Sequence, residues 1–141
     1  TKYFINNNFQ NEINLETTLG SNGVLVKAYS DLINLMWLSK FIRINPHFFR
    51  IAFCISTNKF MNNNQQDAME FISILLNYLH EDLNRIKQKP YLILKGQKEN
   101  ESDILSSQRY YNYYLKRENR IITDLFGGQF QNIIMPKSSL L

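Results

Sequence analysis

The fold is decided by residues 64–86, which read NQQDAMEFISILLNYLHEDLNRI. Apolar side chains recur in this stretch at steps of three and four residues, the spacing that places them on one face of an α-helix. That face comprises Ala68, Phe71, Ile72, Leu75, Leu79, Leu83 and Ile86, while Gln66, Glu70, Ser73, Asn77 and Glu81 fall on another. The pattern predicts a long amphipathic helix that starts at Asn64 and stops before Pro90.

Two further helices are predicted on the N-terminal side of this stretch. Apolar residues recur with helical spacing from Val24 onward, and Asn45-Pro46 is typical of a cap followed by proline at the first position of a short buried helix. Residues 1–23 mix polar side chains with few periodic apolar ones. We expect these residues to form an irregular lead-in.

On the C-terminal side the sequence predicts a loop, two helices and a strand. Ser102 or Asp103 can cap a helix, and a shorter helix from Ile121 is ended by the glycines at 127–128. Residues 129–135 are rich in apolar and β-branched side chains and are predicted to form a strand. A lone strand needs neighbours, so we expect the chain to be part of a larger domain and to have low stability by itself. The aromatic residues expected in the core include Trp37, Phe126 and Phe130.

Composition narrows the class of protein. The 141 residues carry a formal net charge of +4, with no long basic run of the kind that marks nucleic-acid binding. The single cysteine, Cys54, excludes an intramolecular disulfide and a Cys-x-x-Cys metal site, and it fits an intracellular protein of the cytoplasm or nucleus. No apolar run approaches the length of a membrane span, so no membrane partner is expected.

Seven consecutive residues, Gln65-Gln66-Asp67-Ala68-Met69-Glu70-Phe71, resemble the QQD box of the ubiquitin-specific proteases. The same family is matched in sequence and spacing at residues 79–84, 89–91, 114–117 and 124–129. The resemblance implies a mainly α chain with a short β portion, belonging to a papain-like (α+β) cysteine protease fold. Residues 1–141 would then be a single partial domain, with a lead-in at 1–23, the helical thumb at 24–126 and the start of the fingers at 129–141.

Two catalytic elements of that family are absent from this sequence. Neither the cysteine box with its Gly-Asn-Thr-Cys core nor the later histidine box occurs, so we predict no catalytic residue in this chain. Cys54 lies in an apolar segment and is expected to pack as an inert buried side chain. Where many family members have Cys-Pro-x-Cys, half of a zinc site, this chain has Met135-Pro136-Lys137-Ser138. Thioether and hydroxyl groups cannot replace two thiolates around zinc, so we expect no metal and no cofactor.

The candidate binding residues are Asp67 and Glu70, with Gln66 as a weaker third. A three-residue spacing brings the two carboxylates near one another on the first turns of the predicted helix. In the family, the matching acids hold the basic C-terminal tail of ubiquitin, and carboxylates make bidentate, charge-assisted bonds with arginine. A structural alternative remains open, in which Asn64 is the N-cap and Asp67, at the third helical position, only stabilises the helix start.

Three functions follow as hypotheses. The resemblance implies part of a deubiquitinating thiol protease, with ubiquitin, ubiquitinated proteins and the remainder of the catalytic domain as partners. The alternative is a non-catalytic ubiquitin-binding or scaffold module that kept the thumb and lost the enzyme. A weaker third hypothesis is a basic, tyrosine-rich nucleic-acid binder, although the helical spacing of the tyrosines at 110, 111, 113 and 114 favours packing.

Overall fold

The structure is a computed structural model that describes residues 1–40, 42–62, 64–93, 96 and 100–132. Within these ranges it is helical and contains no strand. The elements in chain order are α1 (Lys2–Ile5), the 3-10 helix η1 (Asn8–Glu12), α2 (Val24–Leu38), α3 (His47–Thr57), α4 (Ala68–Asp82), α5 (Asp103–Leu115) and α6 (Ile121–Phe126). None of the helices in these ranges combines the length and the apolar character that crossing a bilayer requires.

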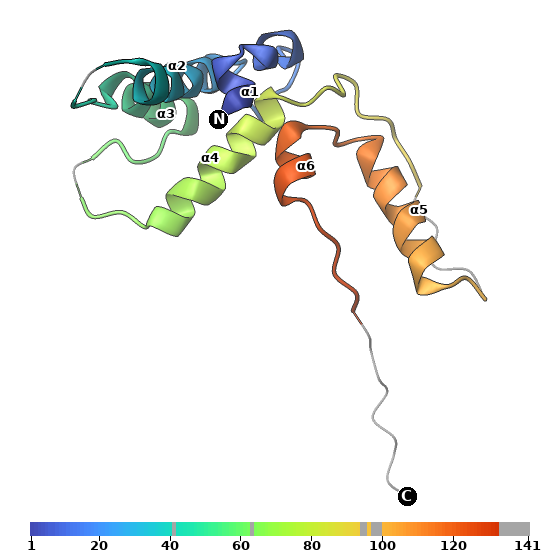
Figure 1. The fold of residues 1–141 in the computed structure, drawn as a ribbon. Helices are drawn as coiled ribbons and strands as arrows, with labels where there is room; N and C mark the ends of the chain where they lie inside the picture. Colours follow the sequence, from blue (N-terminus) through green and yellow to red (C-terminus); the bar gives the residue numbers. More distant parts are fainter. Residues whose placement is uncertain (41, 63, 94–95, 97–99, 133–141) are drawn as a thin grey trace, which may run out of the picture.

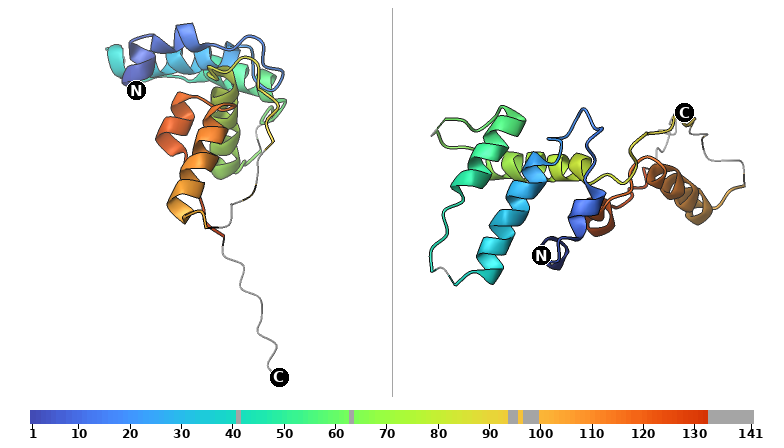
Figure 2. Two further views of the ribbon diagram at one scale, coloured as in Figure 1. Left: turned by 90° about the vertical axis from the view of Figure 1, so that its right-hand side faces the viewer. Right: turned by 90° about the horizontal axis from the view of Figure 1, so that it is seen from above.

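Helices α2, α3 and α4 form the body of the molecule. Helices α2 and α3 run side by side and α4 passes beneath them, whereas α5 lies apart at the other end (Figures 1 and 2). One core cluster joins α2 to α3 through Leu25, Phe49 and Phe53. A second lies where α1, η1 and α2 meet the C-terminal part of α4, and its buried members are Phe4, Phe9, Val26, Ile33, Leu79 and Leu83. Tyr29 on α2 packs against both clusters.

The expected irregular lead-in is wrong, because residues 1–23 contain both α1 and η1. Each of these short helices buries one phenylalanine, Phe4 or Phe9, in the cluster shared with α2 and α4. The hydroxyl of Tyr3 donates to Glu12 Oε2 at 2.6 Å and ties the two elements together. Helices this short are held by tertiary burial more than by local propensity, which is why periodicity did not detect them.

Helix α4 is real but shorter than predicted. It begins at Ala68 and has Asp67 as its N-cap, so the proposed cap at Asn64 is wrong by three residues. At its other end, Leu83 leaves the helix as C-cap. The following side chain, Asn84, accepts from the N–H of Ile86 at 3.1 Å and donates to the carbonyl of Arg117 at 3.3 Å. The side chain of Asn84 thus provides hydrogen bonds to the backbone where the helix ends, and it links this end of α4 to the segment between α5 and α6.

The other helix predictions are mostly confirmed. α2 begins at Val24 as expected, and α3 begins at His47 with Pro46 as the cap residue, one position later than predicted. α5 follows Ser102, whose side chain accepts from the N–H of Leu105, and α6 ends at Phe126 with Gly127 as its C-cap. Residues 129–132 form no strand, and the rest of the predicted strand, including Met135 to Ser138, lies outside the described residues.

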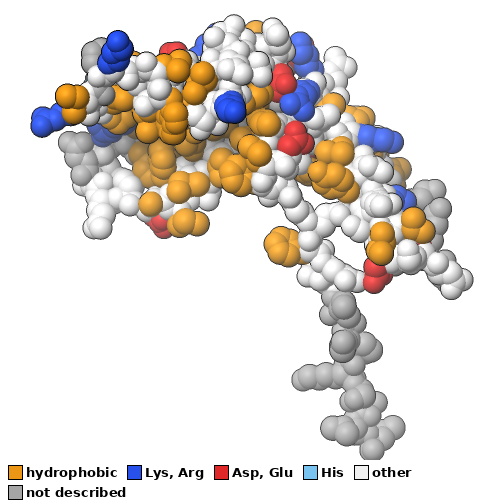
Figure 3. Space-filling model, in the orientation of Figure 1, with side chains coloured by type: hydrophobic (Ala, Val, Ile, Leu, Met, Phe, Trp, Pro, Cys, Tyr) orange, Lys and Arg blue, Asp and Glu red, His pale blue; other side chains and the backbone are white. Residues whose placement is uncertain are grey.

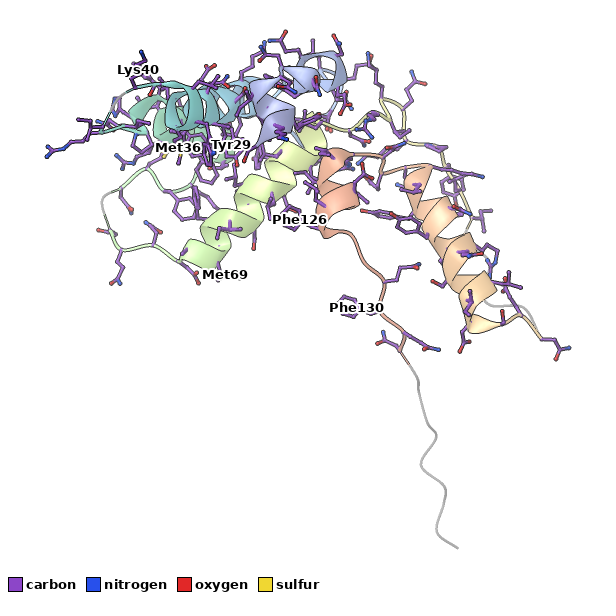
Figure 4. The ribbon with its side chains drawn as sticks, viewed as in Figure 1. Tyr29, Met36, Lys40, Met69, Phe126 and Phe130 are labelled. Carbon is purple, nitrogen blue, oxygen red and sulfur yellow. The ribbon has the colours of Figure 1, made fainter. Side chains whose placement is uncertain are left out.

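Three aromatic side chains expected in the core are exposed. Trp37 and Phe126 are 54% and 68% exposed, and Phe130 is almost fully exposed. Phe126 and Phe130 project toward the open side between α4 and the C-terminal segment (Figure 4). The prediction that these three side chains lie in the core is therefore wrong for the described structure, because aromatic type alone does not fix burial.

Candidate functional site

The N-terminal end of α4 is built on Asp67. Its backbone is extended (φ −80°, ψ 121°), and its Oδ1 accepts from the N–H of Met69 at 2.7 Å and of Glu70 at 3.3 Å. These bonds satisfy two of the donors that a helix start leaves unpaired. Within the described part of the chain they engage Oδ1 alone, so Oδ2 remains available to a ligand.

Glu70, on the first turn of the same helix, is paired with a lysine. Lys59 Nζ lies 2.6 Å from Glu70 Oε1, and the two side chains are 52% and 47% exposed. An ion pair so open to water is weak, because the solvent screens it and both side chains lose freedom in forming it. Lys59 can therefore give way to a cation that makes better bonds with Glu70.

The loop after α3 holds Lys59 in place. Phe60 adopts φ 59°, an uncommon backbone conformation for a bulky residue. Its carbonyl accepts from Cys54 Sγ at 3.2 Å, and its ring packs against Phe53 and Phe71. The N–H of Lys59 donates to Thr57 Oγ1 at 3.2 Å. Packing and hydrogen bonds on both sides of Lys59 thus direct it toward Glu70.

A hollow of about 560 Å³ opens beside these carboxylates. Its floor is apolar and includes the rings of Phe49, Phe53, Phe60 and Phe71. Its polar rim is formed by Arg50, Asn62, Asn64, Gln66 and Asp67. The combination fits a peptide that places an apolar side chain in the hollow and a cationic group on the carboxylates.

The three predicted site residues therefore lie together at one helix end, with different surroundings. Asp67 and Glu70 are exposed, as a binding role requires. The Nε2 of Gln66 donates to Asn62 Oδ1 at 2.6 Å, which supports the loop that borders the hollow. Asp67 also stabilises the helix start, as the structural alternative from the sequence predicted. It does so as the N-cap itself, whereas the prediction placed the N-cap at Asn64.

The described residues contain no nucleophile of the cysteine-protease type. Cys54 is buried, as predicted, and its thiol is directed at a backbone carbonyl. His47 is exposed at the start of α3, and His80 lies 3.7 Å from Glu118 at the far end of α4. A thiolate mechanism needs a histidine within hydrogen-bonding reach of the sulfur, and neither histidine contacts Cys54 in the described structure.

Sequence reasoning missed one charged cluster, formed by His80, Glu81 and Glu118. Their ligand-type atoms lie within 4.8 Å of one another, a spacing that a metal ion could use. However, Lys89 Nζ lies 3.3 Å from both carboxylates, and Arg120 contacts both as well. Two cations already neutralise the acids, so the chemistry of the cluster favours an ion-pair network over a metal site. Glu118 lies far along the sequence from the adjacent His80 and Glu81, so the sequence gave no signal that the three meet.

Comparison with known proteins agrees with the resemblance seen in the sequence. The family model described as ubiquitin carboxyl-terminal hydrolase matches residues 1–139. Ubiquitin carboxyl-terminal hydrolase 15 of Rattus norvegicus and of Homo sapiens are each 37% identical over 135 residues, which cover 96% of this chain and 14% of theirs. Ubiquitin carboxyl-terminal hydrolase 4 of Bos taurus is 33% identical over 135 residues, with the same coverage. The chain spans 14% of the length of these relatives. Because the family model matches nearly the whole chain, the chain belongs to the ubiquitin carboxyl-terminal hydrolase family.

Proposed function

We propose that this chain is the ubiquitin-tail-binding thumb of a deubiquitinating thiol protease, which hydrolyses the bond at the C-terminus of ubiquitin. The observation that carries the proposal is the pair of exposed carboxylates, Asp67 and Glu70, on one helix end beside an apolar hollow. In this proposal the chain binds and positions its substrate. The nucleophile and its histidine belong to parts of the catalytic domain that this sequence does not contain.

The chemistry of the site suits a flexible basic tail. An arginine that approaches the helix end can bond to Asp67 Oδ2 while Oδ1 keeps its two cap bonds, so binding does not cost helix stability. A second cation can displace Lys59 from Glu70. An apolar side chain of the tail can enter the hollow over Phe53 and Phe71. Several such contacts would fix the tail in the extended orientation that attack by a thiolate requires.

The exposed inner side of the chain supports a second part of the proposal, that the remainder of the catalytic domain packs here. Met69, Phe126 and Phe130 are exposed around the concave side between α4 and the C-terminal segment (Figure 4). Hydrophobic side chains also form a broad band across this view of the molecule (Figure 3). An apolar surface of this kind marks a contact with another domain or protein.

We place the activity in the cytoplasm or nucleus, consistent with the single unpaired cysteine.

Titration of isotope-labelled ubiquitin with this chain tests the proposal. Resonances of the ubiquitin tail should shift with the wild-type chain, and the shifts should shrink for Asp67→Asn with Glu70→Gln. Asp31→Asn, which removes an exposed acid from α2, is the matched control and should bind like wild type. Equal binding of full-length and tail-deleted ubiquitin would contradict a tail site.

The alternative of a non-catalytic ubiquitin-binding module has one observation in its favour, the lack of a cysteine–histidine pair in the described residues. A ubiquitin that carries a thiol-reactive group at its C-terminus separates the two functions. Covalent labelling of the protein that contains this segment supports the protease. Tight binding without labelling supports the non-catalytic module.

A further inference from the structure

Helix α3 has a second apolar face, whose side chains are exposed in the described structure. Phe49 and Phe53 are buried against α2 and α4. Phe48, Ile51 and Ile55 recur at steps of three and four residues on a different side of the same helix, and they are exposed. A surface helix ordinarily carries polar residues there. Together with exposed Met61, we call these residues the outer face of α3.

The outer face has a hollow of its own. A depression of about 240 Å³ is lined by Arg50, Ile51, Cys54, Ile55 and Met61. Its walls are apolar except for the Arg50 guanidinium, whose Nη2 donates to the carbonyl of Asn62 at 3.4 Å and so stays beside the hollow. A depression of this size fits a side chain of another protein, whereas a flat lipid surface would leave it unfilled.

The charge around this face is one-sided. Between Asp31 and Asp67 the sequence contains no Asp or Glu, while Lys40, Arg43, Arg50 and Lys59 all fall in that interval. Glu70 offsets the charge of Lys59, so Lys40 and Arg43 are the cations on which the charge of this face depends. Lys40 and Arg43 are exposed in the loop that leads into α3, and Lys and Arg side chains stand at the α2–α3 end of the molecule (Figure 3). Such a field attracts carboxylates and repels a second copy of the same face.

We propose that the outer face of α3 binds an acidic amphipathic helix of a partner protein, which inserts an apolar anchor between Ile51, Ile55 and Met61 and presents carboxylates to the surrounding cations. An amphipathic helix that lays its apolar side on a hydrophobic surface is a common mode of peptide recognition. This partner is acidic, whereas the ligand of the α4 site is basic. The two surfaces therefore select partners of opposite charge.

A synthetic helical peptide with leucines on one side and glutamates on the other is the probe, and fluorescence anisotropy with the chain is the measurement. We expect saturable binding that weakens at high salt, and a loss of at least about tenfold in affinity for Phe48→Ser with Ile55→Ser. The matched control is Ile104→Ser on α5, because Ile104 is 73% exposed and Phe48 and Ile55 are 83% and 66% exposed. The control should bind like wild type. Circular dichroism establishes that each variant is folded.

Three outcomes overturn the proposal. Equal binding of a peptide with lysines in place of the glutamates removes the charge argument. Equal losses for Ile104→Ser and for the α3 variant indicate unspecific adhesion. Binding to vesicles of phosphatidylcholine and phosphatidylserine, with no binding of the peptide, assigns the face to a lipid surface. The peptide should bind Asp67→Asn as well as wild type, so this proposal can fail or hold independently of the ubiquitin site.

Discussion

The acidic residues at the two ends of α4 have opposite surroundings: buried at the C-terminal end and exposed at the N-terminal end. At the C-terminal end, Asp82 is fully buried and accepts from both the N–H and the hydroxyl of Ser21. At the N-terminal end, Asp67 and Glu70 are exposed, and the cap bonds of Asp67 within the described residues use only one of its oxygens. One helix thus uses a carboxylate to close the fold at one end and presents two carboxylates to the solvent at the other.

The difference gives a way to separate the structural acids of this chain from the acids proposed to bind ubiquitin. The buried end also contains Arg120, which is fully buried, and burial lowers its pKa to about 10. Asn14 donates its N–H to the Asp82 carbonyl at 2.7 Å, so the lead-in is fastened there too. Changes at this end should reduce stability, whereas charge changes at the other end should reduce binding with little loss of stability.

The largest effect is expected for Asp82→Ala. The change leaves the partly buried donors of Ser21 without their buried acceptor, and we expect a loss of about 3 kcal/mol in the free energy of unfolding. Urea denaturation followed by circular dichroism measures the loss. Asp31→Ala, at an exposed position, is the control and should change stability by no more than about 0.5 kcal/mol. If Asp82→Ala and Asp31→Ala reduced the free energy of unfolding equally, the structural role assigned to the buried end of α4 would be contradicted.

A smaller effect is expected at the cap. Asp67→Ala removes the acceptor for Met69 and Glu70 and should cost about 1 kcal/mol of unfolding free energy. Asp67→Asn should cost little, because asparagine caps helices about as well as aspartate does. The same urea titrations give both values. If alanine and asparagine were equally harmless, the cap bonds would contribute nothing to stability.

Lys59→Met tests the competition at Glu70. The exposed ion pair contributes at most about 1 kcal/mol, so the stability of the variant should be close to that of wild type. Removing the lysine leaves Glu70 open to a basic ligand, and the affinity for ubiquitin should rise by about twofold to fivefold. Isothermal titration calorimetry measures the change. A rise that persists in the Glu70→Gln background would show that Lys59 acts through some other contact.

The smallest effect concerns pH at the buried end. Burial, followed by the hydrogen bond to Glu12, raises the pKa of Tyr3 well above its ordinary value of 10.0. The folded chain therefore keeps this proton where the unfolded chain loses it. The contribution is fully present below the ordinary pKa, and stability falls as the pH rises above it. Tyr3→Phe should flatten this alkaline decline in urea midpoints, and an unchanged slope would contradict the assignment.

Local sequence signals predicted part of this arrangement. The apolar spacing from Phe71 to Leu83 identified α4, and a cap at Ser102 or Asp103 located the start of α5, because both signals depend on neighbouring residues. Phe4 and Phe9 gave no such signal, since they are buried by contacts with distant helices. The exposure of Phe130 could not be predicted either, because an apolar side chain does not reveal what covers it.

The candidate site was predicted in the same partial way. Asp67, Glu70 and Gln66 were predicted as binding residues, and they lie at one end of α4; their binding role stays a prediction. Lys59 was missed because it is paired with Glu70 through a loop whose course depends on Cys54 and Phe60. The only available signal was that Lys59 lies close to Glu70 in the sequence, and closeness in sequence does not by itself indicate a contact.

The most direct test of the central claim is the affinity of ubiquitin for Asp67→Asn beside Asp67→Ala and wild type, each shown to be folded. If Asp67 binds the basic tail, asparagine should preserve stability yet weaken binding by about tenfold, since the charge-assisted bonds are lost while the cap remains. If Asp67 is only a cap, Asp67→Asn will bind ubiquitin as tightly as wild type does. That result would contradict the assignment of this helix end to the ubiquitin tail.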